Sequence, residues 1–475
     1  MCRFSVFVDV VHGTGTCEDK VFCITQQGLL CIFDATARIV EKWIQLDMGP
    51  CFAMEWLSSQ DLERDGLVVV GGANGIVKVF TPSTLTAVVD LPLPPSLTRH
   101  SSVNTTKQQQ EQEQYAACYA LRRIGDNKLM CVYADRTLIV FDLSDVFDVV
   151  AVFTSTAHRA CVWDVIALQP TTQTQQQSQD FATCSADETV SFWNLNEAQQ
   201  SNQISKSVSF KRDSESINTN IAHNLRESLA STATGLSITH AHGERDFDFT
   251  CGIPDLELPD RISSSFAPRV LALHPNGRLL AVGDKTGRLY LYNVETHRCV
   301  LVIQAHSAEI LSMSFSPLMT FVEEDNSWIA CDSTENNNSV DNNQLVLLAT
   351  AGRDRLIHVF DVSISSTPTN EVVKCSPIDT LDHHSSSVTS VVFTNDGKRM
   401  LSTSGDKSLA FCNVQGRQIE LIKSVQTSNS LLNGLCVDPT NKFAITSGSD
   451  KRLSIWNIHT GKLIRTYKNA DCFPR

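Results

Sequence analysis

The sequence predicts an all-β protein, a β-propeller of about eight four-stranded blades. Three observations lead to this prediction. A turn motif recurs along the chain at roughly 45–50 residues, a spacing typical of solenoids and propellers. Each copy is flanked by segments in which apolar residues alternate with period 2, as they do in half-buried strands. The repeated regions lack the 3.6-residue period of an amphipathic helix.

The recurring motif is clearest in "LLATAGRDRLIHVF" (347–360) and aligns on one aspartate per copy. The aligned aspartates are Asp135, Asp187, Asp354, Asp406 and Asp450. Four residues earlier the last four copies carry a hydroxyl, from Thr183, Thr350, Ser402 and Thr446, whereas the first carries Cys131. Six residues later two copies carry a tryptophan, Trp193 and Trp456. Because Asp accepts hydrogen bonds from nearby backbone N–H groups, it is expected to fix the turn before a third strand.

Eight repeat units follow one another along the chain. The last one divides into strands at 431–437, 442–447, 453–457 and 462–467, separated by "DPTN", "SGSDK" and "HTGK". These are turn-forming residues, and four antiparallel strands per unit make one propeller blade. The units are expected at 3–47, 50–92, 114–155, 160–197, 268–304, 309–382, 387–427 and 430–468.

Three histidines accompany the motif. His158, His306 and His384 each stand four residues before an apolar residue that opens a first strand. The sequence therefore predicts buried Asp–His–Ser/Thr networks that specify packing, completed in the fourth unit by Trp193. The alternative is a Ser-His-Asp hydrolase site. A catalytic site is needed once, in one cleft, whereas this pattern recurs, so these residues are interpreted as structural and no catalytic residue is assigned.

Composition limits the classes of function. The chain has 475 residues, a formal net charge of −13, and no run of more than two basic residues. Nucleic-acid and anionic-membrane surfaces need clustered Lys and Arg, so neither partner is expected. No apolar stretch approaches the roughly 20 residues of a membrane helix. Sixteen cysteines without a C-x-x-C pair predict buried thiols in a reducing compartment, so the protein is expected to be cytoplasmic.

Metal, cofactor and small-molecule sites are not predicted. His240 and His242 lie near Glu244 and Asp246, but this spacing does not define a metal site. Glycine-bearing turns such as "GANG" (72–75) fit no phosphate-binding loop. The sequence thus indicates a protein that binds other proteins.

Polar segments interrupt the repeats at 101–114, 171–179, 198–266 and 323–338. Such Gln-, Ser- and Asn-rich composition buries too little apolar surface to repay ordering, so these segments are predicted to be disordered inserts. They are interpreted as padding of surface loops, and the alternative for the Ser-rich segment is a target of phosphorylation. The chain is expected to divide into blades 1–4 (1–197), the insert 198–266, and blades 5–8 (267–475).

Several stretches resemble one scaffold family of WD-repeat proteins. "KLMCVYADRTLIVFDLSDV", "HRACVWDVIAL", "ATAGRDRLIHVFDV" and "LDHHSSSVTSVVF" are similar to its central part. The family comprises mitogen-activated protein kinase-binding protein 1 and the microcephaly-associated spindle-pole WD-repeat protein. The resemblance implies tandem propellers, no catalysis, and scaffolding of the c-Jun N-terminal kinase pathway and of spindle poles or centrosomes. The chain looks like the middle of that architecture, without its kinase-docking tail.

Two questions stay open at this point. The eight blades are expected either as two partial propellers, one on each side of the long insert, or as one closed ring, since propellers avoid exposed edges by closure. The leading function is a scaffold for proteins, among them mitogen-activated protein kinases or spindle-pole components. The alternatives are a substrate adaptor of a ubiquitin ligase or another complex-assembly factor, and a propeller enzyme.

Overall fold

A computed structural model describes most of the chain. The residues outside the described part are 1–6, 13–19, 26, 35–38, 58–65, 97–114, 125–126, 157, 169–180, 196–205, 210–266, 323–326, 332–343, 367–370, 428–430, 439, 450–451 and 469–475. The candidate metal residues His240, His242, Glu244 and Asp246 therefore lie outside the described residues.

The described part of the first half forms four antiparallel four-stranded sheets, each with its strands in chain order. The first two contain β1 (Phe7–His12), β2 (Lys20–Thr25), β3 (Leu29–Asp34), β4 (Ile39–Gln45), β5 (Cys51–Leu57), β6 (Leu67–Gly72), β7 (Val77–Phe80) and β8 (Ala87–Asp90), with a short 3₁₀ turn η2 (Ala73–Gly75) between β6 and β7. The next two contain β9 (Cys118–Ile124), β10 (Lys128–Tyr133), β11 (Leu138–Asp142), β12 (Val150–Ser155), β13 (Val162–Ala167), β14 (Phe181–Ser185), β15 (Thr189–Trp193) and β16 (Lys206–Ser209).

The second half adds four more sheets of the same kind and one small sheet. The four-stranded sheets contain β17 (Pro268–Leu273), β18 (Leu279–Asp284), β19 (Arg288–Asn293), β20 (Cys299–Gln304); β21 (Ile310–Phe315), β25 (Leu347–Gly352), β26 (Ile357–Ser366), β27 (Glu371–Leu381); β28 (Val388–Phe393), β29 (Arg399–Ser404), β30 (Ser408–Gln415), β31 (Gln418–Gln426); and β32 (Leu432–Val437), β33 (Phe443–Gly448), β34 (Arg452–Asn457), β35 (Lys462–Lys468). The three-stranded sheet consists of β22 (Met319–Val322), β23 (Ser327–Ala330) and β24 (Gln344–Leu345). The prediction of about eight four-stranded blades is confirmed.

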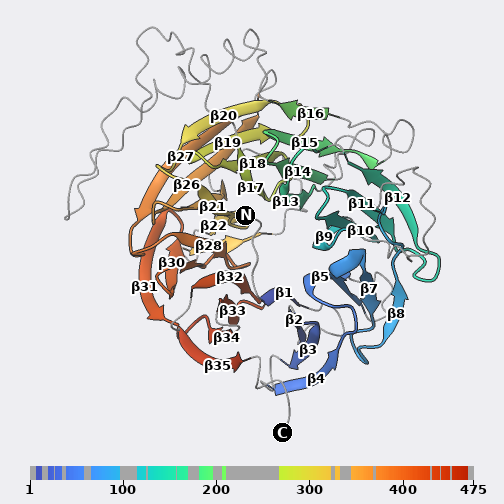
Figure 1. Cartoon of the computed structure of the whole chain (residues 1–475). Coiled ribbons are helices and arrows are strands. Elements are labelled where there is room, and N and C mark those ends of the chain that lie inside the picture. Colours follow the sequence, from blue (N-terminus) through green and yellow to red (C-terminus); the bar gives the residue numbers. More distant parts are fainter. Residues whose placement is uncertain are drawn as a thin grey trace, which may run out of the picture.

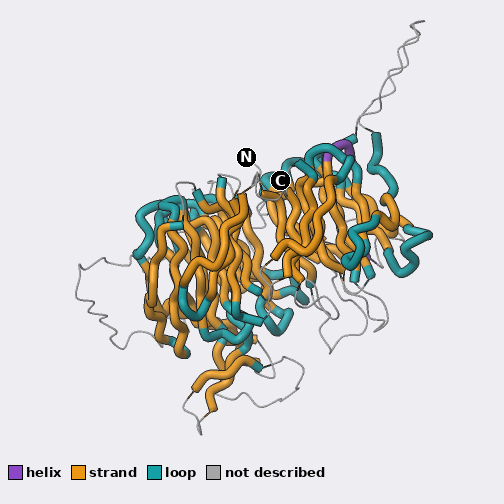
Figure 2. The backbone as a smooth tube through the Cα atoms, turned by 90° about the horizontal axis from the view of Figure 1, so that it is seen from below, coloured by secondary structure: helices purple, strands orange, loops and turns teal. Residues whose placement is uncertain are grey.

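The blades follow one another around a common centre (Figure 1). The first strand of each blade lies innermost and the fourth outermost, so β1, β5, β9, β13, β17, β21, β28 and β32 surround the axis. Consecutive inner strands contact one another from β1 round to β32, whereas among the described residues β32 and β1 make no contact of similar extent. From the side where β4 and β35 face each other, the strands form two stacks (Figure 2). The arrangement is a ring that is not closed between the last blade and the first.

The core lies between neighbouring blades rather than inside one blade. Val69 and Val79 of the second blade pack with Leu129 and Ile139 of the third, and all four are buried. Phe192 of the fourth blade packs in the same way against Leu280 of the fifth. Successive side chains of a strand point to opposite faces of its sheet. Both faces bury apolar residues, because a sheet inside the ring is covered by a neighbouring blade on either side. Each blade therefore depends on the next for its burial.

Two segments differ from the sequence-based description. The fourth strand of the fourth blade is β16, which lies beyond residue 197, where the sequence placed the end of this unit. The segment 198–266 was predicted to be disordered, and this is wrong for Lys206–Ser209, because they pair with β15 and complete the blade. The segment 323–338 was predicted to be disordered, and this is wrong for Ser327–Ala330, which form β23. The physical reason for the strand is packing: Trp328 lies against the turn at Gly416 of the next blade and against Phe321.

Among the described residues no helix has the length and apolar character needed to cross a membrane.

Candidate functional site

The predicted site residues gather at one end of the blades, which we call the His–Asp face. It is the end at which the second and third strands of each blade are joined and at which the chain enters the next inner strand. At the turn centres of this face lie Asp135, Asp187, Asp354 and Asp406. Asp450, the fifth aligned aspartate, lies outside the described residues.

The fourth blade holds the most complete network. His158 donates from Nδ1 to the Asp187 carboxylate at 3.1 Å, and its Nε2 lies 2.7 Å from Thr183 Oγ1. The indole N–H of Trp193 donates to the same Thr183 oxygen at 2.9 Å. His158, Thr183 and Trp193 are at most 3% exposed. The four side chains predicted from the sequence thus form one chain of hydrogen bonds from the surface turn into the core.

The sixth and seventh blades hold shorter versions. His306 bridges Asp354 and Thr350, with both ring nitrogens 2.9 Å from their oxygen partners. His384 bridges Asp406 at 3.2 Å and Ser402 at 2.8 Å. Phe360 and Cys412 stand where the fourth blade has its tryptophan, so neither version has the indole bond. In all three blades the aspartate also accepts the N–H of the residue after the histidine, at 2.8, 3.0 and 2.8 Å. The aspartate therefore ties its own turn to the connection arriving from the previous blade.

The remaining predicted residues form only parts of this pattern. In the third blade Asp135 accepts the N–H of Thr137 at 3.1 Å. In the eighth blade Trp456 donates to Thr446 Oγ1 at 3.0 Å. The fifth blade places Asp284 two residues before its turn centre, where it accepts N–H bonds from Thr286 and Arg288, each at 2.8 Å. Asp284 was missed because it does not fall in the aligned position.

Burial and hydrogen bonding act on these carboxyls in opposite directions. Burial alone raises the pKa of Asp187, but the hydrogen bonds from His158 and Thr189 outweigh it and hold the pKa below its ordinary value. The pKa of Asp354 is lowered in the same way, against burial, by its bonds to His306. The carboxylates are thus charged at neutral pH and compensated inside the fold.

His306, Asp354 and His358 are the described residues whose spacing comes nearest to that of a metal site. Their potential ligand atoms lie within 4.8 Å of one another. However, His306 uses both ring nitrogens for Asp354 and Thr350, and His358 Nδ1 lies 2.9 Å from Thr380 Oγ1. A metal ion would have to displace the bonds that hold the turn. The arrangement also offers no exposed nucleophile, since Thr350 and Ser402 are fully buried. Its chemistry is that of a structural network.

A second feature of the His–Asp face was missed by the sequence analysis. All eight inner strands carry a β-bulge at the same place, directly after their first residue. The extra residues are Val8, Phe52, Tyr119, Trp163, Arg269, Leu311, Thr389 and Asn433. Bulges re-aim a side chain and are frequent next to functional sites and at the rims of barrels. A signal was present in the sequence, because Trp163, Leu311 and Thr389 each follow a motif histidine by five residues.

Four consecutive blades place aromatic and cationic residues at these bulges. We call Phe52, Tyr119, Trp163 and Arg269 the mouth arc; they come from β5, β9, β13 and β17, which adjoin around the centre in Figure 1. Phe52 and Tyr119 meet edge to face with ring centroids 4.9 Å apart. The Arg269 guanidinium carbon lies 3.8 Å from the centroid of the Trp163 ring. These contacts cross blade boundaries, so the arc is assembled only when the blades pack side by side.

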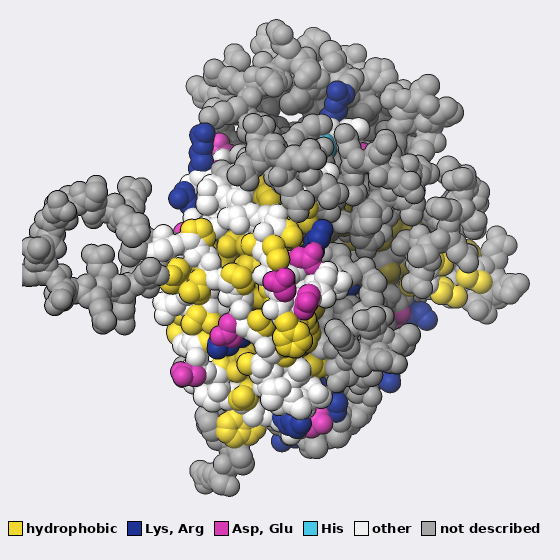
Figure 3. All heavy atoms as spheres, turned by 90° about the vertical axis from the view of Figure 1, so that its right-hand side faces the viewer, with side chains coloured by type: hydrophobic (Ala, Val, Ile, Leu, Met, Phe, Trp, Pro, Cys, Tyr) yellow, Lys and Arg dark blue, Asp and Glu magenta, His cyan; other side chains and the backbone are white. Residues whose placement is uncertain are grey.

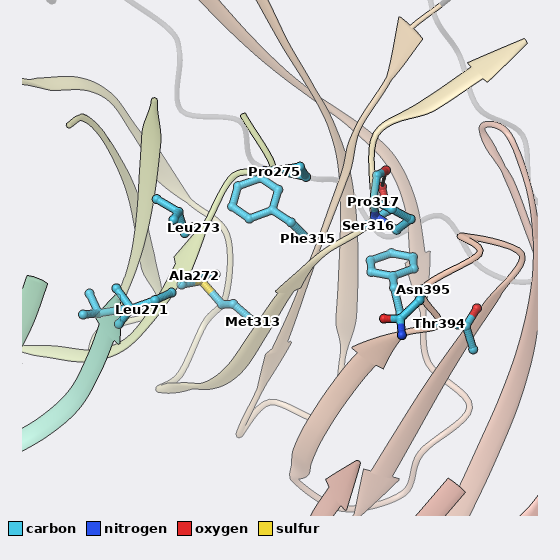
Figure 4. Close-up of a pocket in the computed structure, with 12 residues that line it drawn as sticks. Leu271, Ala272, Leu273, Pro275, Met313, Phe315, Ser316, Pro317, Thr394 and Asn395 are labelled. Atoms are coloured by element: carbon cyan, nitrogen blue, oxygen red, sulfur yellow. Dashed lines mark hydrogen bonds between the residues drawn. The ribbon is translucent and has the colours of Figure 1, made fainter. Parts of the chain in front are cut away.

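The opposite end of the inner strands contains a cavity of 520 Å³ with apolar and uncharged polar side chains in its lining (Figure 4). Leu273, Phe315 and Phe393 line it, each the last residue of its inner strand, with Thr394 and Asn395 at one side. Its lining side chains are uncharged. The buried His274 ring lies edge to face with Phe315 at 5.2 Å, and burial lowers the pKa of His274 to about 4. The cavity therefore lacks a group that acts as an acid or base at neutral pH.

The outer side of the ring differs from both ends of the blades in its mixture of apolar and charged side chains (Figure 3). Figure 3 shows the side formed by the second to fourth blades, where the described apolar side chains lie among acidic and basic ones. Phe147, in the turn between β11 and β12, is 87% exposed.

Fold and motif together define the class: the chain is a WD-repeat protein of the β-propeller type. It is 30% identical to human mitogen-activated protein kinase-binding protein 1 over 99% of its own length and 28% of that relative. It is 27% identical to mouse WD repeat-containing protein 62 over 98% of its own length and 27% of that relative. The resemblance to this family is confirmed. The chain spans less than a third of the length of these relatives.

Two further comparisons concern the second half of the chain and the fold. Residues 269–472 match the family model described as KNTC1, N-terminal. Sqt1 of Chaetomium thermophilum, solved bound to the N-terminus of the ribosomal protein L10, superposes with a TM-score of 0.58 over 96% of this chain and 97% of Sqt1, at 15% identity. At this identity the likeness shows the β-propeller fold alone.

Proposed function

We propose that the chain is a non-enzymatic scaffold that binds other proteins through the mouth arc of its His–Asp face. The observation that carries the proposal is the run of Phe52, Tyr119, Trp163 and Arg269 at four consecutive bulges. Trp, Tyr and Arg are the residues enriched at energetic hot spots of protein interfaces. All four side chains are partly buried, so each is held in place while part of it faces solvent. Such preorganised anchors lower the entropy lost on binding.

The absence of an enzyme activity is part of the same proposal. The histidines of the network are engaged with carboxylates and hydroxyls inside the blades, and the cavity at the other end is lined by uncharged groups. Catalysis by general acids and bases needs a titratable group within reach of a substrate. We therefore propose neither a cofactor nor a small-molecule substrate.

The relatives suggest which partners the chain binds and where it acts. We propose that the partners belong to the mitogen-activated protein kinase pathway or to the spindle pole, and that the chain acts in the cytoplasm or at the centrosome. The name mitogen-activated protein kinase-binding protein 1 supports the first part, for a protein of which this chain spans 28%. The division into blades 1–4, the insert 198–266 and blades 5–8 is kept as a proposal on domain organisation.

The test is affinity purification of the full chain from dividing cells, with partners identified by mass spectrometry. Trp163→Ala combined with Phe52→Ala is compared with Leu421→Ala combined with Leu463→Ala, which removes apolar groups that are 40% and 47% exposed on outer strands. Circular dichroism and thermal unfolding confirm that both variants are folded. The proposal expects kinase-pathway or spindle-pole proteins that the mouth-arc variant alone loses. Cullin-ligase subunits would instead indicate a substrate adaptor, and equal recovery by both variants would exclude the mouth arc as the binding surface.

A further inference from the structure

We infer that the mouth arc and the cationic side chains beside it bind an acidic peptide segment that carries an aromatic or aliphatic anchor. This inference rests on the proposed function and names the chemistry of the partner. A carboxylate of the peptide pairs with the guanidinium groups at Arg269 and Arg353, and the anchor packs on the aromatic rings of the neighbouring blades.

The first support is a carboxylate shared by two guanidinium groups. Glu309 lies 3.0 Å from Arg269 Nε and 3.2 Å from Arg353 Nη2. One negative charge therefore faces two positive ones, which leaves the cluster with a net positive charge. Arg269 is fixed between Glu309 and the Trp163 ring, whereas the Arg353 side chain is 65% exposed. Planar guanidinium groups bind carboxylates with two parallel hydrogen bonds, so a second carboxylate has donors available here.

The second support is the charge around the cluster. Arg136, Arg159, Lys285 and Arg355 are exposed at the turns and connections of the third to sixth blades on this face. The carboxylates of Asp187 and Asp354 belong to the same region but are only 8% and 7% exposed, being directed to histidines and backbone N–H groups. Glu188 and Asp382 are exposed carboxylates of this region. On a chain of net charge −13, this local excess of exposed basic groups favours an acidic ligand.

The third support is the apolar part of the arc. The edge-to-face pair of Phe52 and Tyr119 continues the line of Trp163 along the inner rim. An aromatic or aliphatic side chain next to a carboxylate therefore finds a ring surface one or two blades from the guanidinium cluster. Charge alone does not account for aromatic residues at three consecutive bulges, since the solvent-facing part of each ring is apolar surface that a partner covers.

A defined probe tests the inference with the full chain. The probe is a fluorescently labelled random copolymer of glutamate and tyrosine, and binding is followed by anisotropy at low and high salt. Arg353→Glu is expected to weaken binding at least tenfold, and Trp163→Leu at least threefold. The matched control is Arg417→Glu, because Arg417 is also exposed and ion-paired, at 2.7 Å from Asp361, but lies in the turn between β30 and β31 at the opposite end. Binding of the control within twofold of the unmodified chain is expected.

Three outcomes overturn the inference. One is equal loss in Arg353→Glu and Arg417→Glu. Another is binding of polyglutamate as tight as that of the glutamate–tyrosine copolymer, which would show that the ligand needs no aromatic anchor. The third is tighter binding of a single-stranded oligonucleotide that Arg353→Glu abolishes, which assigns the surface to nucleic acid. If any one of these outcomes occurs while the Trp163/Phe52 variant still loses cellular partners, the acidic-peptide inference is wrong but the proposed scaffold function is retained. If no partner depends on the mouth arc, the proposed function itself fails.

Discussion

The fourth, sixth and seventh blades reach the same turn as the first, second and fifth with different residues. In each of these turns the residue after the centre has a left-handed backbone conformation, with φ between 67° and 87°. In the first group this residue is Glu188, Arg355 or Lys407, and in the second it is Gly28, Gly75 or Gly287. A left-handed conformation costs an L-residue about 1–2 kcal/mol and glycine almost nothing. The six blades therefore share the turn conformation but differ in the residue that adopts it.

Aspartate at the turn centre explains the difference. In the first group the carboxylate accepts the N–H two residues further on, at 3.2, 3.3 and 2.9 Å, and also binds the preceding connection. The third blade, with Asp135 and the left-handed Arg136, belongs with this group although it lacks the histidine. The second group has Gln27, Asn74 or Thr286 at the centre. Carboxylate bonds thus offset the strain of a side chain where glycine is absent.

The largest effect is expected from a side chain at a glycine turn. A Cβ on Gly287 would clash with the backbone carbonyl oxygen of His306, so Gly287→Ala must displace backbone as well as accept a strained φ of 87°. The free energy of unfolding is expected to fall by about 3 kcal/mol or more. Urea unfolding followed by tryptophan fluorescence measures it. Arg355→Ala is the control, because this position already carries a Cβ in the same conformation; an equal loss there would contradict the comparison.

Removing the carboxylate from a complete network comes next. Asp354→Ala leaves His306 and the N–H groups of Ser307 and Leu356 without an acceptor, so a loss of about 3 kcal/mol is expected. Asp135→Ala removes one N–H bond and is expected to cost about 1 kcal/mol. The same denaturation experiment compares them. Similar losses in both variants would mean that the histidine contributes nothing to the turn.

The histidines make stability depend on pH. Burial lowers the pKa of His358 to about 3 and that of His274 to about 4, so the unfolded chain takes up their protons first as the pH falls below about 6.5. Their contribution is therefore lost progressively below that pH. At pH 5 each is expected to cost about 2 kcal/mol relative to pH 7, from 1.36 kcal/mol per pH unit. The depressed pKa of Asp354 adds a further loss only as the pH falls below about 4.

His358→Ser sharpens this prediction, because Ser191 and Ser454 occupy the equivalent position in the fourth and eighth blades. The variant is expected to lose about 2 kcal/mol less stability between pH 7 and pH 5 than the unmodified chain, whatever its stability at pH 7. Unfolding midpoints at the two pH values measure the difference. An unchanged difference would show that His358 does not resist protonation in the fold.

The smallest effect is expected from Arg355→Gly. Relief of the left-handed strain and the greater entropy of the unfolded glycine oppose each other, so the free energy of unfolding should change by less than about 1 kcal/mol. A larger loss, measured by the same urea unfolding, would reveal that the Arg355 side chain itself supports the turn.

The sequence predicted the repeat but not everything that the repeat positions. Asp187, Asp354 and Asp406 were recognisable because their spacing from the strands is constant, and the eight four-stranded blades followed from that spacing. The mouth arc was not recognisable in the sequence. A bulge residue is defined by the register of two paired strands, and its residue type differs between blades, as Phe52 and Thr389 show. β23 was missed because the ordering of a polar segment depended on one tryptophan packing on a distant turn. The blades could therefore be predicted from local sequence pattern, whereas the mouth arc depends on strand register and tertiary packing.

The most direct test of the central claim, that the mouth arc is the binding surface, is hydrogen–deuterium exchange of the full chain. Exchange is measured with and without the most abundant partner recovered by affinity purification. Protection is predicted at the beginnings of β5, β9, β13 and β17 and at the turn containing Arg353. Protection confined to the opposite end, around Phe315 and Phe393, or to the outer strands would contradict the account.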